Sequence, residues 1–146
     1  ILEYLDTLHE SSPLIPELNK FECKTAIHLA NGIIESTLLR TMELRRPECR
    51  QSKTFVNHLE ARVMRGIDTM EKKRETTIGD WLNGEEITTA VALSYVDFRF
   101  STEWRKTAPT LEKWFERVSC RKSMELSAPT RERPIAMSDK IGGAKA

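Results

Sequence analysis

Histidines and cysteines are the side chains of this sequence that are best suited to bind a metal or to act as nucleophiles. They are His9, His28, His58, Cys23, Cys49 and Cys120. No histidine lies three or four residues from another histidine or cysteine, so one helical turn cannot present two ligands. The sequence also has no glycine-rich phosphate loop, no G-x-S-x-G and no H-E-x-x-H. We therefore predict neither a catalytic residue nor a metal site in this chain.

The cysteines indicate the compartment. Cys23 lies beside an apolar helical stripe and is expected to be a small core residue, whereas Cys49 and Cys120 are expected to be exposed near helix ends. An odd number without paired spacing argues against a disulfide framework. No signal peptide follows Ile1, and no apolar run is long enough to cross a membrane. We expect a reducing, cytoplasmic location and no membrane partner.

Charge excludes another class of partner. The 146 residues carry a formal net charge of +1, and 31% of them are charged. Residues 1–20 have a net charge of −3, and no later block exceeds +2. A nucleic-acid footprint normally needs a strongly basic patch, so we expect no nucleic-acid partner.

Apolar residues recur every three or four positions, which predicts helices and no strands. The expected helices cover about residues 1–10, 21–46, 52–74, 84–100 and 109–121. The predicted fold is all-α, a bundle of four principal helices behind a short leading helix. The pattern dissolves after residue 121. The pattern of the leading helix begins at Ile1 without a capping residue before it. We therefore expect the sequence to be truncated at its start.

Local signals refine these elements. Asn83 and Glu86 have the spacing of a capping box. The helix at 84–100 is apolar on almost every side, which predicts a buried central helix. Gly32 lies in the middle of the long helix and is expected to mark a close backbone contact or a bend. Residues 71–75 (EKKRE) are expected to form a solvated last turn.

Asp97 and Arg99 are charges near the end of the apolar helix. Two residues apart, they cannot face each other on a helix. We expect each to pair with a neighbouring helix or cap. The alternative is that Arg99 helps to bind an anionic ligand.

Several stretches occur in an order and spacing that one family shares. They are residues 1–6, 12–16, 29–35, 43–47, 95–100, 104–105 and 109–114. They resemble the bacterial branch of the glutathione S-transferases, in which a thioredoxin-like domain leads through a proline-containing linker into an all-helical C-terminal domain. The resemblance covers about residues 1–130. It implies that residues 1–10 are the last helix of an otherwise absent thioredoxin-like domain, 11–20 a linker, 21–130 the helical domain and 131–146 a flexible tail.

The same resemblance implies a function. The family transfers glutathione thiolate to an electrophile, and the Ser, Tyr or Cys that activates the thiol lies in the thioredoxin-like domain. This chain would then supply a wall of the electrophile pocket and a homodimer interface, with glutathione as co-substrate. The implied wall residues are Asn31, Ile34, Glu35, Leu38 and Trp104. For these residues, bundle core or dimer interface is the alternative.

The sequence departs from the family at two places, and these departures limit which functional roles the resemblance implies for this chain. Asn31 stands where the family often has an acid, and the His-Lys pair of some cysteine-type members is absent from residues 21–46. A non-catalytic interaction module is therefore the alternative function. A third hypothesis is a fragment without a function of its own, which predicts an exposed apolar patch along the opening helix.

Overall fold

The computed structural model describes residues 2–8, 13–73 and 81–128, and within these ranges the chain is helical without a strand. The α-helices are α1 (Leu2–Asp6), α2 (Lys20–Leu44), α3 (Lys53–Lys73), α4 (Gly84–Arg99), α5 (Pro109–Ser119) and α6 (Lys122–Ser127). Short 3₁₀ turns lie at η1 (Glu17–Asn19), η2 (Glu48–Arg50) and η3 (Glu103–Lys106). The all-α prediction is confirmed. The tail expected at 131–146, and residues 74 and 75 of the charged run, lie outside the described residues.

Two expectations about helix ends were wrong. α1 ends at Asp6, because Thr7 and Leu8 already form a turn. Helical structure continues past residue 121, where the apolar pattern ends, since α6 follows. Only Met124 of α6 packs partly on the core, so this helix has almost no apolar periodicity by which to recognise it.

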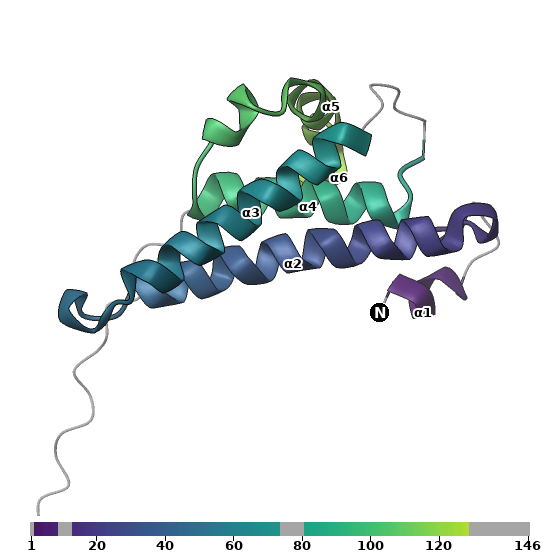
Figure 1. Ribbon diagram of the computed structural model, residues 1–146. Helices are drawn as coiled ribbons and strands as arrows, with labels where there is room; N and C mark the ends of the chain where they lie inside the picture. Colours follow the sequence, from purple (N-terminus) through teal and green to yellow (C-terminus); the bar gives the residue numbers. More distant parts are fainter. Residues whose placement is uncertain (1, 9–12, 74–80, 129–146) are drawn as a thin grey trace, which may run out of the picture.

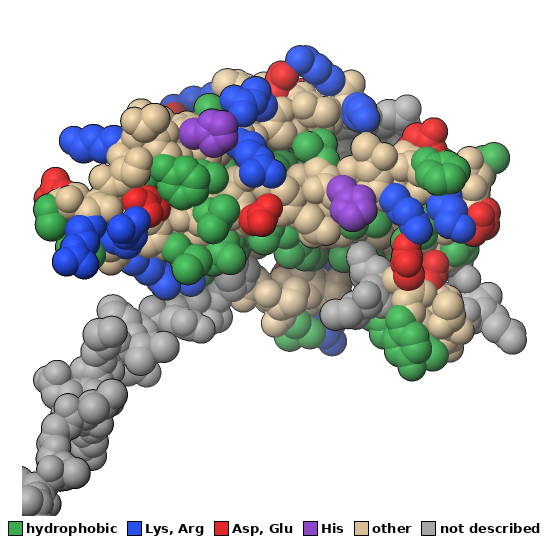
Figure 2. All heavy atoms as spheres, turned by 60° about the horizontal axis from the view of Figure 1, so that its bottom comes forward, with side chains coloured by type: hydrophobic (Ala, Val, Ile, Leu, Met, Phe, Trp, Pro, Cys, Tyr) green, Lys and Arg blue, Asp and Glu red, His purple; other side chains and the backbone are tan. Residues whose placement is uncertain are grey.

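The long helices α2 and α3 form a hairpin, and α4 also packs along α2, behind α3 in the view of Figure 1. α5 packs across α3 and α4, and α6 follows it (Figure 1). On the face turned forward in Figure 2, charged side chains alternate with isolated hydrophobic ones. The connection between α2 and α3 is short, which favours an antiparallel arrangement of these two helices.

The core lies where α2, α3, α4 and α5 meet. Its largest fully buried side chains include Trp104, Trp114, Leu93 and Leu111. The composition of α4 predicted a helix that is buried on every side. This expectation was wrong, because Val91 is 44% exposed. On that side a hollow of about 170 Å³ lies between α4 and α6.

The capping box at the start of α4 is confirmed. The Asn83 side chain accepts a hydrogen bond from the Glu86 N–H at 2.9 Å, and the Glu86 carboxylate accepts one from the Asn83 N–H at 3.0 Å. Two backbone donors that the helix leaves unpaired are thus satisfied.

The close contact between helices lies at Gly66, not at Gly32 as expected. A Cβ on Gly66 would lie 2.8 Å from Ile33 Cγ1 and 2.9 Å from Ile33 Cδ1. A Cβ on Gly32 would meet only Arg62 Nη2, at 3.8 Å. Gly66 therefore lets α3 approach α2, whereas at Gly32 only the end of a long α3 side chain comes near, at ordinary van der Waals distance.

Glu71 is not part of a solvated turn. Its carboxylate accepts hydrogen bonds from the backbone N–H groups of Thr110 (3.0 Å) and Leu111 (2.7 Å) at the start of α5. Ala108, the N-cap residue of α5, has no side chain that could do this. Burial raises the pKa of Glu71, but the hydrogen bonds from Leu111 and Thr110 outweigh it, and the pKa lies below its ordinary value.

We predict opposite effects for the same substitution at the two glycines. Gly66→Ala should lower the free energy of unfolding by about 1–3 kcal/mol, because its methyl group overlaps buried Ile33. Gly32→Ala should raise it by up to about 1 kcal/mol, through helix propensity alone. Urea denaturation of both variants measures this, and equal effects would contradict the assignment of the contact.

We predict that Glu71→Gln lowers the free energy of unfolding by about 1 kcal/mol at pH 7. Because the pKa of Glu71 is lowered in the fold, its stabilisation is complete above the ordinary Glu pKa of about 4.3 and is lost as the pH falls through the folded-state value. Denaturation over a pH series should show the full difference at pH 7 and a difference that shrinks progressively as the pH falls below about 4.3. Asp68→Asn, which removes an exposed ion pair with Lys72, is the control and should cost less than about 0.5 kcal/mol.

Candidate functional site

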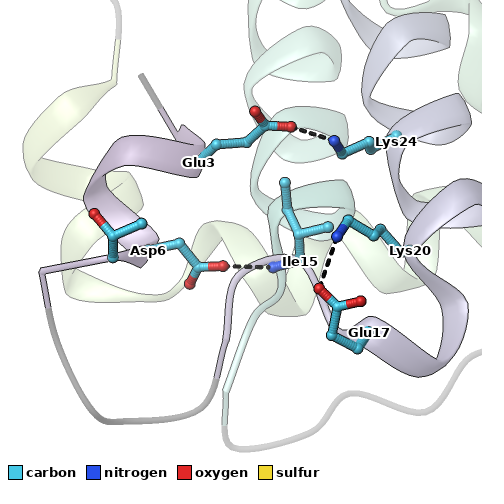
Figure 3. A pocket seen from close by; sticks show the side chains of 7 residues that line it. Glu3, Asp6, Ile15, Glu17, Lys20 and Lys24 are labelled. Carbon is cyan, nitrogen blue, oxygen red and sulfur yellow. Dashed lines mark hydrogen bonds and ion pairs between the residues drawn. The ribbon is translucent and has the colours of Figure 1, made fainter.

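A pocket of about 290 Å³ lies between α1, the segment that follows it and the start of α2 (Figure 3). Acidic, basic, hydroxyl and aliphatic side chains share its wall. They are Glu3, Asp6, Thr7, Ile15, Glu17, Lys20 and Lys24. This pocket was not predicted from the sequence. The signal for it was the spacing of Glu17, Lys20 and Lys24, which places all three along one side of a helix.

The cations of the pocket are already neutralised by its acids. Lys20 Nζ lies 2.7 Å from Glu17 Oε1, and Lys24 pairs with Glu3 (Figure 3). The hydrogen bond from Lys24 lowers the pKa of Glu3, and the bond to Glu17 raises the pKa of Lys20. The pocket therefore presents both signs of charge.

The backbone at Leu14 and Ile15 is fixed by contacts with α1 and with the start of α4. Asp6 accepts hydrogen bonds from the N–H groups of Leu14 (2.6 Å) and Ile15 (3.3 Å). The Leu14 carbonyl accepts one from the Gly84 N–H at 2.7 Å. α1 is thereby held against the starts of both α2 and α4.

The cysteines lie where the sequence indicated. Cys23 is fully buried below Leu14, and burial raises the pKa of its thiol, which disfavours a thiolate. Cys49 and Cys120 are exposed. No group of three His, Cys, Asp or Glu side chains that could hold a metal occurs in the part of the chain that the structure describes. Among the same residues, no helix is long and apolar enough to cross a membrane.

Four of the five residues expected to line a pocket lie together on α2. Lys24, Asn31 and Leu38 are seven residues apart, so they follow one side of the helix away from the pocket. Asn31 and Leu38 are exposed on this side, together with Glu35, while Ile34 packs partly against the core. This side of α2 is defined here as the α2 wall (Asn31, Ile34, Glu35 and Leu38).

Trp104, the fifth expected residue, is not brought to the α2 wall. It lies in η3 with 1% of its surface exposed. Its Nε1 donates to Asp97 Oδ1 at 2.8 Å, and its ring meets that of Phe115 edge-on at 6.1 Å. Arg105 also pairs with Asp97, at 2.6 Å. The expectation that Asp97 pairs with a neighbouring element is confirmed.

Arg99 behaves differently from Asp97. Its guanidinium lies over the ring of the adjacent Phe98, 4.1 Å from the centroid. It therefore makes a contact within its own helix rather than the expected one with a neighbouring element. Its role toward an anionic ligand stays a prediction.

An apolar patch occupies one side of α1 and the turn after it. Tyr4 is 67% exposed, Leu5 45% and Leu8 62%. Exposed apolar patches commonly mark surfaces that bind another domain or protein. The pocket, the α2 wall and the apolar patch together offer polar and apolar side chains that a ligand could contact. None of their residues is an activated nucleophile.

Comparison with known proteins points to one family, although no protein-family model matches the chain. The uncharacterised GST-like protein YibF of Escherichia coli K12 is 26% identical over 134 residues, which is 88% of this chain and 66% of that protein. A glutathione transferase family member from Pseudomonas fluorescens Pf-5, solved with bound S-(propanoic acid)-glutathione, is 29% identical with a TM-score of 0.83. The glutathione S-transferase of Methylobacillus flagellatus KT, solved with glutathione bound, is 26% identical with a TM-score of 0.78.

The match covers most of this chain and about two thirds of each relative. The two solved structures each cover 88% of this chain, which in turn spans 68% and 66% of their lengths. The described residues are all helical, as in the C-terminal domain of this family. On sequence and fold together, this chain is similar to glutathione S-transferases, and its all-helical structure fits the C-terminal domain of that family.

Proposed function

We propose that this chain is the electrophile-binding half of a glutathione transferase, which conjugates glutathione to a small electrophile together with a thioredoxin-like domain. The observation that carries the proposal is that the exposed α2 wall continues the side of α2 on which Lys24 pairs with Glu3 of α1, and that the apolar side of α1 is exposed. Relatives of similar fold have glutathione or a glutathione derivative bound. Residues 1–10, with α1, would belong to the end of the thioredoxin-like domain, 11–20 would be the linker and 21–130 the helical domain.

The geometry supports a cleft between the two domains. A domain that covered Tyr4, Leu5 and Leu8 would remove their apolar surface from water, which is favourable. Because α1 is fixed to the starts of α2 and α4, such a domain would stand beside the α2 wall. Ligand sites commonly lie at such domain interfaces.

The residues of the α2 wall suit the binding of an electrophile rather than its activation. Leu38 and Ile34 offer apolar contact, the Asn31 amide can donate and accept hydrogen bonds, and Glu35 adds a carboxylate. The other domain would lower the pKa of the glutathione thiol, and the wall would hold the electrophile beside the thiolate. Trp104, inside the core, would act on the wall only through packing.

Two further parts of the proposal follow the family. We propose a homodimer, as the resemblance implies. We also propose a cytoplasmic location, which the free thiols Cys23, Cys49 and Cys120 support.

We predict that Leu38→Ala and Asn31→Ala, in the protein that carries both domains, raise the KM for the electrophile by roughly threefold to tenfold. One lost apolar contact or hydrogen bond is worth about 1 kcal/mol. The KM for glutathione should change less than about twofold, since its contacts would lie in the other domain. Steady-state kinetics with a generic aromatic electrophile measures both constants.

The matched control is Leu44→Ala, because Leu44 lies on the same helix with similar exposure, 41% against 44% for Leu38. It should leave both constants unchanged. If the two-domain protein bound no glutathione in calorimetry, the catalytic proposal would fail and the non-catalytic interaction module would be favoured. If Leu38→Ala and Leu44→Ala behaved alike, the placement of the wall would fail.

A further inference from the structure

The hollow of about 170 Å³ between α4 and α6 shares no described lining residue with the α2 wall or with the pocket at α1. Its α4 residues lie on the side of that helix that faces away from the buried Leu93 and Val96. Several of its residues are exposed, so a small molecule can enter it from solvent. The described residues that line this α4–α6 hollow are Val91, Ser94, Tyr95, Met124, Ser127 and Ala128.

The walls of the hollow suit an aromatic ring without a charge. Val91 and Ala128 contribute aliphatic surface, Met124 a thioether and Tyr95 a phenol ring. Thioether sulfurs and aromatic side chains both make favourable contacts with a second ring. None of the described lining residues is an acid, a lysine or an arginine, so nothing among them compensates a charged ligand for the water that it loses.

The size of the hollow limits the ligand to a single ring. A cavity of about 150 Å³ is known to hold benzene. A hollow of about 170 Å³ therefore has room for one six-membered ring with a small substituent, and a second ring would extend beyond it.

Three hydroxyl groups line the hollow, and they differ in what they can offer to a ligand. Ser127 Oγ donates its proton to the Ser123 carbonyl at 2.8 Å, so toward a ligand it acts as an acceptor. Within the described ranges, neither the Ser94 nor the Tyr95 hydroxyl has a hydrogen-bond partner, so each can donate or accept. A ligand hydroxyl matches this set, because it donates one hydrogen bond and accepts others.

We propose that the α4–α6 hollow binds a small phenol, which is a neutral molecule with one aromatic ring and one hydroxyl group. The ring lies against Val91, Tyr95 and Met124. The hydroxyl donates to Ser127 Oγ and accepts from Ser94 or Tyr95. This site goes beyond the proposed conjugation of glutathione and does not depend on it.

The bound molecule bridges two helices. It contacts α4 on one side and α6 on the other, and α6 otherwise reaches the core through Met124. Because a ligand that binds the folded state stabilises it, the phenol should hold α6 more firmly against α4.

The test is the binding of phenol to this chain, with toluene as the probe that has the ring without the hydroxyl. NMR of methyl-labelled methionines shows where each probe binds. Phenol should shift the methyl signal of Met124 and not that of Met42, which is 55% exposed on α2. We expect a Kd for phenol of roughly 0.1–1 mM, as for other ligands of this size. Toluene should bind at least about fivefold more weakly, because it leaves the hydroxyls of the hollow unpaired.

Two variants separate the hydroxyls from the space. Ser94→Ala combined with Tyr95→Phe removes the unpartnered hydroxyls and keeps the ring of residue 95. This double variant should bind phenol at least about threefold more weakly than the wild type and toluene equally well. Ala128→Phe should abolish the binding of both probes, because it places a ring in the hollow from an exposed position. Leu126→Phe is the matched control, since Leu126 is 79% exposed on α6 outside the hollow, and it should bind phenol like the wild type.

Circular dichroism should show unchanged helix content in each variant. If Ala128→Phe loses helix, the Met124 signal of the wild type still decides where phenol binds. A Met124 signal that phenol does not shift, or that shifts only together with Met42, would overturn the proposal. Equal affinity for phenol and toluene would overturn the role of the hydroxyls. Because these measurements contain no glutathione, their failure would leave the conjugation proposal intact.

Discussion

The peptide group of Leu14 joins parts of the molecule that are distant in the sequence. Its N–H is held by the Asp6 carboxylate and its carbonyl by the Gly84 N–H. A Cβ at residue 84 would lie 3.1 Å from that carbonyl oxygen, so the approach depends on glycine. The orientation of α1 against α2 and α4 follows from these contacts, and so do the pocket and the direction in which the apolar side of α1 faces.

Helical periodicity carried most of the fold prediction, because burial repeats every three or four residues. The capping box at Asn83 and Glu86 was also visible, since both of its hydrogen bonds are local. What periodicity could not show were contacts between distant residues. Gly66 and Gly32 look alike in sequence, and only the position of Ile33 on α2 shows which of them lies between two helices.

In the candidate site, too, local relationships were predictable from the sequence and contacts between distant residues were not. The spacing of Asn31, Ile34, Glu35 and Leu38 placed them together, because all four lie on one helix. Trp104 was grouped with them through family resemblance, and it lies instead in the core with its indole bonded to Asp97. The pocket at α1 was missed because its walls come from three segments, whose approach depends on backbone hydrogen bonds that side-chain patterns do not reveal.

The cap that α3 places on α5 has a consequence for how the chain folds. The first N–H groups of α5 are satisfied by Glu71, about forty residues earlier in the chain, and not by a local side chain. Short helices are marginal in isolation, so α5 should become stable only after α3 is in place. The last helices would then join the bundle in a late step, and the chain should unfold as one cooperative unit and not helix by helix.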